Sequence, residues 1–187
     1  MLQRVGQFLE SRWVLLLVLL AFTACKLQHL HYPFYLDEGW VYAPAVKAMA
    51  ANGPSLMPDA IIPELSRGHP LLFHFLAGIW IRCFGASNIS MHAFPLLVSI
   101  LFLAALYEAC RKLFDARTAT LALLLVATRV IFFVQSSFVY PEVMVAMFTF
   151  LSYYFYARDR FFLTALMLSL LFFTKEGGVI FGIVLGI

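Results

Sequence analysis

The sequence predicts an all-α polytopic membrane protein with a long first outer loop that carries helices lying on the membrane surface. Of the 187 residues, 63% are hydrophobic and only 12% are charged, and the mean hydropathy is +0.90. No soluble globular class has this composition. The apolar residues fall into separate runs with short basic clusters between some of them, a pattern typical of chains that cross the bilayer several times.

Charge and cysteine content exclude other classes. The net charge of +3 is too small to indicate a nucleic-acid-binding surface. Cys25, Cys83 and Cys110 lie in or beside apolar runs and do not form a spaced set. We therefore interpret the three cysteines as packing residues, with neither a disulfide framework nor a zinc site.

The first helix is expected over residues 10–30. Arg4 and Arg12 precede its apolar run, and residues 22–25 (Phe-Thr-Ala-Cys) resemble a lipoprotein cleavage site. Glu10 and the further apolar runs downstream argue against removal of this segment. We interpret it as an uncleaved anchor.

Residues 70–81 decide the topology. As a helix this segment is only about 18 Å long, whereas the hydrocarbon core of a bilayer is about 30 Å thick. With a cytoplasmic N-terminus and a flat helix at 70–81, the cytoplasmic side holds seven basic residues and the longer outer segments hold five. A spanning helix would instead move the basic clusters at 111–117 and 158–160 outside. The positive-inside rule therefore favours a surface helix within a first outer loop at 31–91.

The remaining elements follow in order. Residues 38–51 are expected to form a short surface helix, which ends in the turn sequence Asn-Gly-Pro at 52–54. Further spanning helices are expected at 91–113, at 116–135, from Pro141 to the basic cluster at 158–160, and from there to Lys175. The last apolar run, 179–187, has no polar end. We therefore expect residues 1–187 to be the N-terminal part of one longer transmembrane domain.

In this topology the acidic candidates share the outer face. Asp37 and Glu38 follow the first helix, and a carboxylate at a dry, outward-facing site suits deprotonation of a hydroxyl or amine acceptor, or the binding of a divalent cation. A solvated loop that ends a helix is the alternative. Glu142 opens a helix behind Pro141, where stabilisation of the helix dipole explains a carboxylate as well as catalysis does.

The basic candidates suggest a phosphate ligand. Arg67 and His69 precede the surface helix, where a cation and an imidazole suit a phosphate, although a snorkelling arginine in a turn is the simpler explanation. Lys175 and Glu176 lie between two apolar runs and form either a structural ion pair or part of a head-group site. Arg129 lies inside the helix expected at 116–135 and must reach water, a partner or a lipid phosphate.

Several motifs, taken in order, resemble those of the GT-C membrane glycosyltransferases, and most closely the group of protein O-mannosyltransferases and lipid A aminoarabinose transferases. The motifs are Tyr-Leu-Asp-Glu-Gly-Trp at 35–40, Arg-Gly-His-Pro-Leu-Leu at 67–72, Phe-Gly-Ala-Ser at 84–87, Leu-Phe at 113–114, Pro-Glu at 141–142 and Thr-Lys-Glu at 174–176. Each motif alone is weak, but together they cover nearly the whole chain in the family's order.

The resemblance implies a GT-C-like helical bundle and inverting transfer of a sugar from a polyprenyl-phosphate carrier. The acceptor would be a lipid, a glycan or a protein at the extracytoplasmic face, and the chain would lie in a bacterial inner (plasma) membrane with its N-terminus in the cytoplasm. It implies no defined cofactor and leaves a divalent cation open. Acceptor recognition would lie beyond residue 187, so an isolated front part is expected to be inactive.

The resemblance also implies roles for individual residues. Asp37 falls on the acidic residue that serves the family as base, and Glu142 falls where many members carry a second acid. Lys175 matches a lysine common at the end of its helix. His69 falls on a motif that often continues with two prolines, and here Leu71 replaces the second.

Two other functions remain as alternatives. A transporter or flippase for a lipid-linked substrate would fit Arg129 and a helix broken at Gly177 and Gly178, but its polar residues should lie near mid-bilayer. A non-catalytic assembly subunit would tolerate the loss of Asp37.

Overall fold

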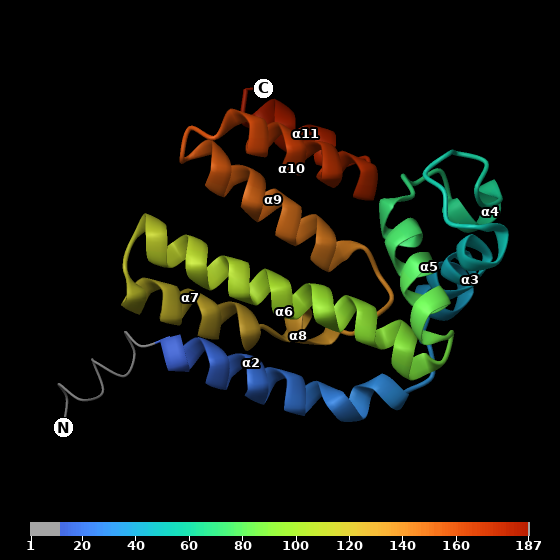
Figure 1. Cartoon of the computed structure of the whole chain (residues 1–187), viewed down its shortest axis with the longest axis horizontal. Coiled ribbons are helices and arrows are strands. Elements are labelled where there is room, and N and C mark those ends of the chain that lie inside the picture. Colours follow the sequence, from blue (N-terminus) through green and yellow to red (C-terminus); the bar gives the residue numbers. More distant parts are fainter. Residues whose placement is uncertain (1–11, 187) are drawn as a thin grey trace.

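A computed structural model of the chain describes residues 12–186, and the regular elements among these residues are all helical. They are α2 (Arg12–Leu27), η1 (Gln28–His31), η2 (Glu38–Tyr42), α3 (Ala43–Asn52), α4 (Pro63–Ser66), α5 (Leu72–Phe84), α6 (Asn88–Leu113), α7 (Ala116–Ala127), α8 (Val130–Gln135), α9 (Glu142–Tyr156), α10 (Phe161–Thr174) and α11 (Gly178–Val184). Helices α2, α6, α7, α9 and α10 form the body of a bundle, and α3, α4 and α5 gather at one end of it (Figure 1).

Within residues 12–186, two helical segments are long and apolar enough to cross a membrane. The first is α2 continued by η1, and the second is α6, which has 26 residues. The first agrees with the helix predicted at 10–30, although the start of that prediction, with Arg4 and Glu10, lies outside the described residues. Helix α6 begins three residues before its predicted start because the hydroxyl of Ser87 caps it by accepting a hydrogen bond from the Ser90 amide.

The helix predicted at 116–135 is not continuous, and this prediction was wrong. Helices α7 and α8 are separated at Thr128 and Arg129, where Arg129 has extended backbone angles (φ −67°, ψ 125°). The Thr128 hydroxyl donates a hydrogen bond of 2.7 Å to the Leu124 carbonyl. Such a side-chain bond competes with the backbone ladder of the helix. Arg129 therefore lies exposed at a break, and not within a helix.

The segment predicted as surface helices is an α3–α5 unit. Helix α5 packs against α3 at Gly78, where an added Cβ would lie 2.9 Å from Cγ of the buried Met49. The expected turn at 52–54 is present, because Gly53 follows the end of α3 with a φ of +96°. Helix α5 lies at the end of the bundle and not alongside its long helices (Figure 1).

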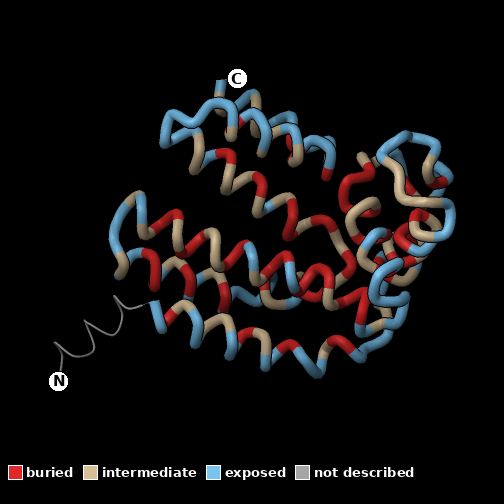
Figure 2. Tube along the Cα trace, in the orientation of Figure 1, coloured by how far each residue is buried: buried red, intermediate tan, exposed pale blue. Residues whose placement is uncertain are grey.

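The core lies between the helices, and apolar side chains also cover the outside. Phe22, Leu103, Tyr107 and Leu171 are buried at the centre. The outer face of α2 is exposed in Figure 2 and carries large apolar residues such as Trp13, which is 68% exposed. Water would not favour such a surface, whereas lipid would.

The two ends of the bundle carry different polar groups. One end holds the close of α10 and the starts of α6 and α9, together with the α3–α5 unit (Figure 1). Asp37 and Glu142 both lie at this end. The opposite end holds the α6–α7 and α9–α10 connections, with the basic residues Arg111, Lys112, Arg158 and Arg160.

Candidate active site

Asp37 stands at the start of η2 with its carboxylate turned to solvent. The preceding Leu36 has a φ of +48°, so the chain turns sharply before the acid. The side chain of Asp37 is 62% exposed, and its Oδ1 lies 3.9 Å from Nη2 of Arg67. Arg67 itself ends the short helix α4 in a left-handed conformation. Because both side chains are exposed and the distance is long, this is a weak and easily exchanged pair.

Glu38, the neighbouring acid, is completely buried. Its Oε1 accepts hydrogen bonds from the Val139 amide at 2.7 Å and from Nε2 of His92 at 3.0 Å. Its Oε2 accepts from the Tyr35 amide at 3.2 Å. The carboxylate thus joins the loop before η2 to α6 and to the link between α8 and α9. With every oxygen engaged and none facing solvent, Glu38 suits a role in holding Asp37 in place.

His92 is the side-chain partner of the buried Glu38 carboxylate. Nδ1 of His92 lies 3.0 Å from the carbonyl oxygen of Leu30, which can only accept a hydrogen bond. Nδ1 therefore carries a proton. Nε2 of the same ring lies 3.0 Å from Oε1 of Glu38, so His92 and Glu38 share a proton within one buried hydrogen-bonded pair.

Glu142 and Lys175 form a second ion pair, between α9 and the end of α10. Nζ of Lys175 donates to Oε1 of Glu142 at 3.1 Å, and both side chains are about one-third exposed. The other carboxylate oxygen of Glu142 is buried and has no hydrogen-bond partner among the described residues. One oxygen of this carboxylate is thus fixed by lysine, and the other retains its full capacity to accept.

His69 and Glu176 form a third pair. Nδ1 of His69 lies 2.9 Å and 3.0 Å from the two carboxylate oxygens of Glu176. Burial raises the pKa of Glu176, but hydrogen bonds from its own amide and from His69, with the charges of His69 and Lys175, hold it below its usual value. The contact orients the imidazole so that Nε2 remains available to a ligand.

Three aromatic residues complete the cluster, and the sequence analysis missed all of them. The Tyr42 ring stacks on His74 at 5.9 Å and meets Tyr140 edge-on at 5.1 Å. The Tyr140 hydroxyl accepts a hydrogen bond of 3.1 Å from the Glu38 amide. Both ring nitrogens of His74 are buried without a partner among the described residues, and burial, with the charge of His69, lowers the pKa of His74 to about 4. The spacing of residues in the sequence did not point to Tyr42, because the position of Tyr42 relative to Asp37 depends on a π-helical turn.

One predicted residue, Arg129, is not brought to this site. No contact among the described residues joins Arg129 to the cluster, because the α7–α8 break leaves its side chain exposed. Within residues 12–186, no three His, Cys, Asp or Glu side chains are grouped as a metal site would require.

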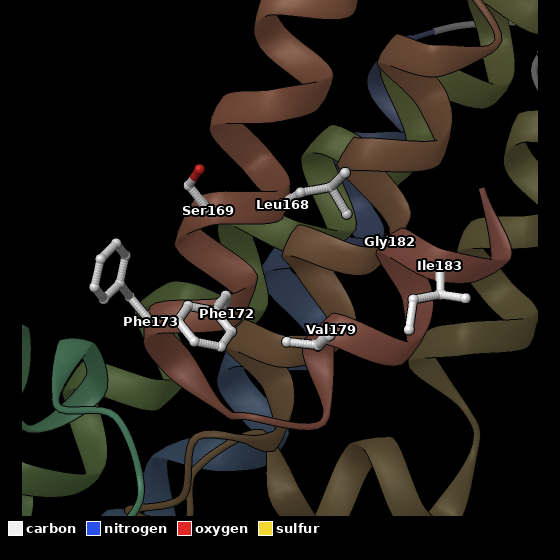
Figure 3. A pocket seen from close by; sticks show the side chains of 8 residues that line it. Leu168, Ser169, Phe172, Phe173, Val179, Gly182 and Ile183 are labelled. Carbon is white, nitrogen blue, oxygen red and sulfur yellow. The ribbon is translucent and has the colours of Figure 1, made fainter. Parts of the chain in front are cut away.

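The best-defined groove lies elsewhere. It holds about 330 Å³ between α10 and α11 and is lined by apolar side chains such as Phe172 and Ile183, as Figure 3 shows. These residues carry no titratable group. The chemistry therefore belongs to the polar cluster and not to this groove.

Together, these elements and their connecting loops bring four carboxylates, three basic groups and two phenols to one end of the bundle: Asp37, Glu38, Glu142 and Glu176, then Arg67, His69 and Lys175, then Tyr42 and Tyr140. An exposed carboxylate suits abstraction of a proton from an acceptor. Neighbouring cations suit the charge that grows on a departing phosphate.

Comparison with known proteins supports this chemistry. A family model described as dolichyl-phosphate-mannose-protein mannosyltransferase matches residues 68–186. The match includes His69, Glu142, Lys175 and Glu176 and begins just after Arg67. No curated protein and no solved structure matches the chain. The family consists of glycosyltransferases that use a sugar linked to a lipid phosphate, and its membrane character agrees with the two long apolar helices. Because the match covers more than half of the sequence, the chain belongs to the dolichyl-phosphate-mannose-protein mannosyltransferase family.

Proposed function

We propose that the chain forms the base and donor-phosphate site of a glycosyltransferase that transfers a sugar, with inversion, from a polyprenyl-phosphate carrier to an acceptor at the extracytoplasmic face of a membrane. The observation that carries the proposal is the convergence of Asp37, Arg67, Glu142 and Lys175 at one end of the bundle. Family membership supplies the reaction class.

Asp37 acts as the base. Its carboxylate is exposed and only loosely paired, whereas that of Glu38 is buried and fully hydrogen-bonded. In the proposed step the acceptor oxygen attacks the anomeric carbon and its proton passes to Asp37. The bond from the anomeric carbon to the phosphate oxygen breaks with its electron pair, leaving the polyprenyl phosphate. Attack opposite the leaving group inverts the anomeric centre.

Arg67, Lys175 and His69 hold the donor phosphate. Each is paired with a carboxylate in the structure, and two of the three pairs, Arg67–Asp37 and His69–Glu176, include a side chain that is more than half exposed. An incoming phosphate can therefore exchange with these carboxylates at small cost. When Arg67 turns to the phosphate, the carboxylate of Asp37 is left free to take the proton of the acceptor.

The proposed membrane arrangement is multi-pass, with a cytoplasmic N-terminus. The basic α6–α7 and α9–α10 connections then face the cytoplasm, in keeping with the positive-inside rule. In this arrangement the α3–α5 unit, which gathers at one end of the bundle in Figure 1, faces the outside. A lipid-anchored donor in the outer leaflet would present its phosphate at this level. The acceptor class, whether lipid, glycan or protein, stays open.

Replacement of Asp37 by Asn in the full-length protein tests the proposal. The change keeps the size of the side chain and removes the base, so transfer from a polyprenyl-phosphate sugar should fall at least about 100-fold, the lower range of general-base contributions. Asp59→Asn is the matched control, because Asp59 is an exposed acid in the same outer segment. Near-normal turnover in Asp37→Asn, with Asp59→Asn also normal, would refute the base.

One observation favours a transporter instead. The α7–α8 break beside Arg129 has the form of a discontinuous membrane helix. Flipping of a fluorescent polyprenyl-phosphate sugar across vesicles by the Asp37→Asn variant, without transfer, would support that alternative.

A further inference from the structure

The turn that carries Asp37 and Glu38 is a π-helix, and this places one further side chain beside the base. In η2 the Ala43 amide donates to the Glu38 carbonyl, five residues earlier. Residues five apart therefore lie one turn apart, and Tyr42 follows Asp37 at this spacing. Trp40 and Val41, at α-helical spacing from Asp37, do not take its place, since Trp40 is 83% exposed and Val41 is buried in the core.

The ring of Tyr42 is fixed on several sides. It stacks on His74 with an interplanar angle of 13° and meets the edges of Tyr140 and Phe73 at 5.1 Å and 6.4 Å. These contacts hold the phenol half-buried and limit its rotamers. Its hydroxyl makes no hydrogen bond to any part of the chain that the structure describes, so the donor capacity of this group is free for a ligand.

The surroundings keep the hydroxyl protonated. Burial, followed by the charges of Glu142, Asp37 and Tyr140, raises the pKa of Tyr42 to about 12, and the charge of Arg67 opposes this. His74, which stacks on the ring, stays neutral because burial lowers its pKa to about 4. The phenol is thus a donor, not a base, at neutral pH.

We propose that Tyr42 is a catalytic residue whose hydroxyl donates a hydrogen bond to the phosphate oxygen that leaves the anomeric carbon. The inference rests on the proposed function. Tyr42 keeps its proton throughout: the acceptor proton goes to Asp37, the electron pair of the broken bond goes to the phosphate oxygen, and the products are the glycosylated acceptor and the polyprenyl phosphate. The bond strengthens as negative charge grows on that oxygen, so it lowers the barrier and not the energy of the bound donor.

The first test replaces Tyr42 by Phe in the full-length enzyme. Phe keeps the stacking on His74 and Tyr140 and removes only the hydroxyl. We expect kcat to fall about 100- to 1,000-fold, the range for loss of one such donor, with little change in the KM for the donor. Tyr35→Phe is the matched control, because Tyr35 is 63% exposed and contacts Glu38 only through its backbone. Unchanged kcat in Tyr42→Phe would overturn the inference.

A second measurement separates a donor from a packing residue. Fluorinated tyrosine at position 42 has a more acidic phenol, so activity should fall on the alkaline side at a lower pH than in the wild type. Fluorinated tyrosine at position 35 should leave the pH profile unchanged. A profile that does not move with fluorination at 42 would assign Tyr42 a structural role, even where Tyr42→Phe is impaired.

The two proposals fail in different ways. If Asp37→Asn is inactive and Tyr42→Phe is fully active, only the role of Tyr42 is lost. If Asp37→Asn turns over normally while Tyr42→Phe does not, the base is wrong and the phosphate donor stands.

Discussion

At the scale of single residues, adjacent side chains with the same chemistry have opposite environments. Asp37 and Glu38 are both acids, yet one is 62% exposed and the other has no exposed surface. The sequence predicts that this pair is important but cannot assign the roles, since the direction of each side chain depends on the turn that follows. The same limit applies to Tyr42 and His92, whose positions depend on partners about 50 to 100 residues away in the sequence, such as Glu38 for His92.

The burial of His74 predicts how the free energy of unfolding changes at acid pH. Its pKa is about 4 in the folded chain, against an ordinary value of 6.5, because burial disfavours the charged ring. Above pH 6.5 neither state binds the proton and the stability is fully present. As the pH falls from 6.5 towards 4, only the unfolded chain gains the proton, and the free energy of unfolding falls by at most about 1.4 kcal/mol per pH unit.

We therefore expect His74→Phe to flatten the loss of stability between these pH values. Phe keeps an aromatic ring against Tyr42 and cannot be protonated. Thermal unfolding in detergent over this pH range measures the effect, with His31→Phe as the control because His31 is exposed. An identical pH dependence in the His74→Phe variant and the wild type would contradict the assignment.

At the scale of elements, the sequence predicts which segments are helical better than where they are interrupted. The apolar runs gave α2, α6, α9 and α10. The α7–α8 break was missed because no proline or glycine marks it in the sequence around Thr128 and Arg129. The start of α6 was missed because a serine cap extends the helix beyond its apolar run.

Glu38 links these elements, and its loss should separate them. The carboxylate joins the loop before η2, α6 and the α8–α9 link through His92, Tyr35 and Val139. Glu38→Ala would leave the His92 ring and the Val139 amide buried without their partner. Removal of one member of a buried pair costs about 3–5 kcal/mol, so we expect a marked fall in the unfolding temperature.

Thermal unfolding of the purified protein measures this change, and Glu64→Ala provides the control. Glu64 is an exposed acid in α4. Equal stability of the Glu38→Ala and Glu64→Ala variants would show that Glu38 does not hold the elements together. Since Asp37 is the next residue along, we also expect activity to fall in Glu38→Ala.

At the scale of the whole molecule, the distribution of basic residues predicted that side chains far apart in the sequence lie on the same side of the membrane. The count of basic residues favoured a surface helix at 70–81, and this placed Asp37 and Glu142, over 100 positions apart in the sequence, on one side. The structure places both acids close enough to Tyr42 for their charges to raise its pKa. Hydropathy alone could not do this, because a segment as apolar as α5 is also compatible with a membrane span.

The proposed topology predicts which residues can be labelled from outside the membrane and which only from the cytoplasmic side. In a full-length background without Cys25, Cys83 and Cys110, Asp59→Cys and Gly177→Cys should react with a membrane-impermeant maleimide added outside. Position 59 lies in the segment between α3 and α4, and position 177 follows Glu176 in the α10–α11 connection. Both are exposed, and an added side chain at Gly177 meets no atom within 4 Å.

Arg160→Cys is the control for the opposite side, since residue 160 lies in the exposed α9–α10 connection. It should react only after the membrane is opened. Asp59→Cys samples the segment beside Asp37 and Arg67, and Gly177→Cys samples the segment beside Glu142 and Lys175. Labelling of these two from opposite sides would separate the base from the phosphate-binding lysine by the thickness of the bilayer, and one sugar-transfer site could not contain both.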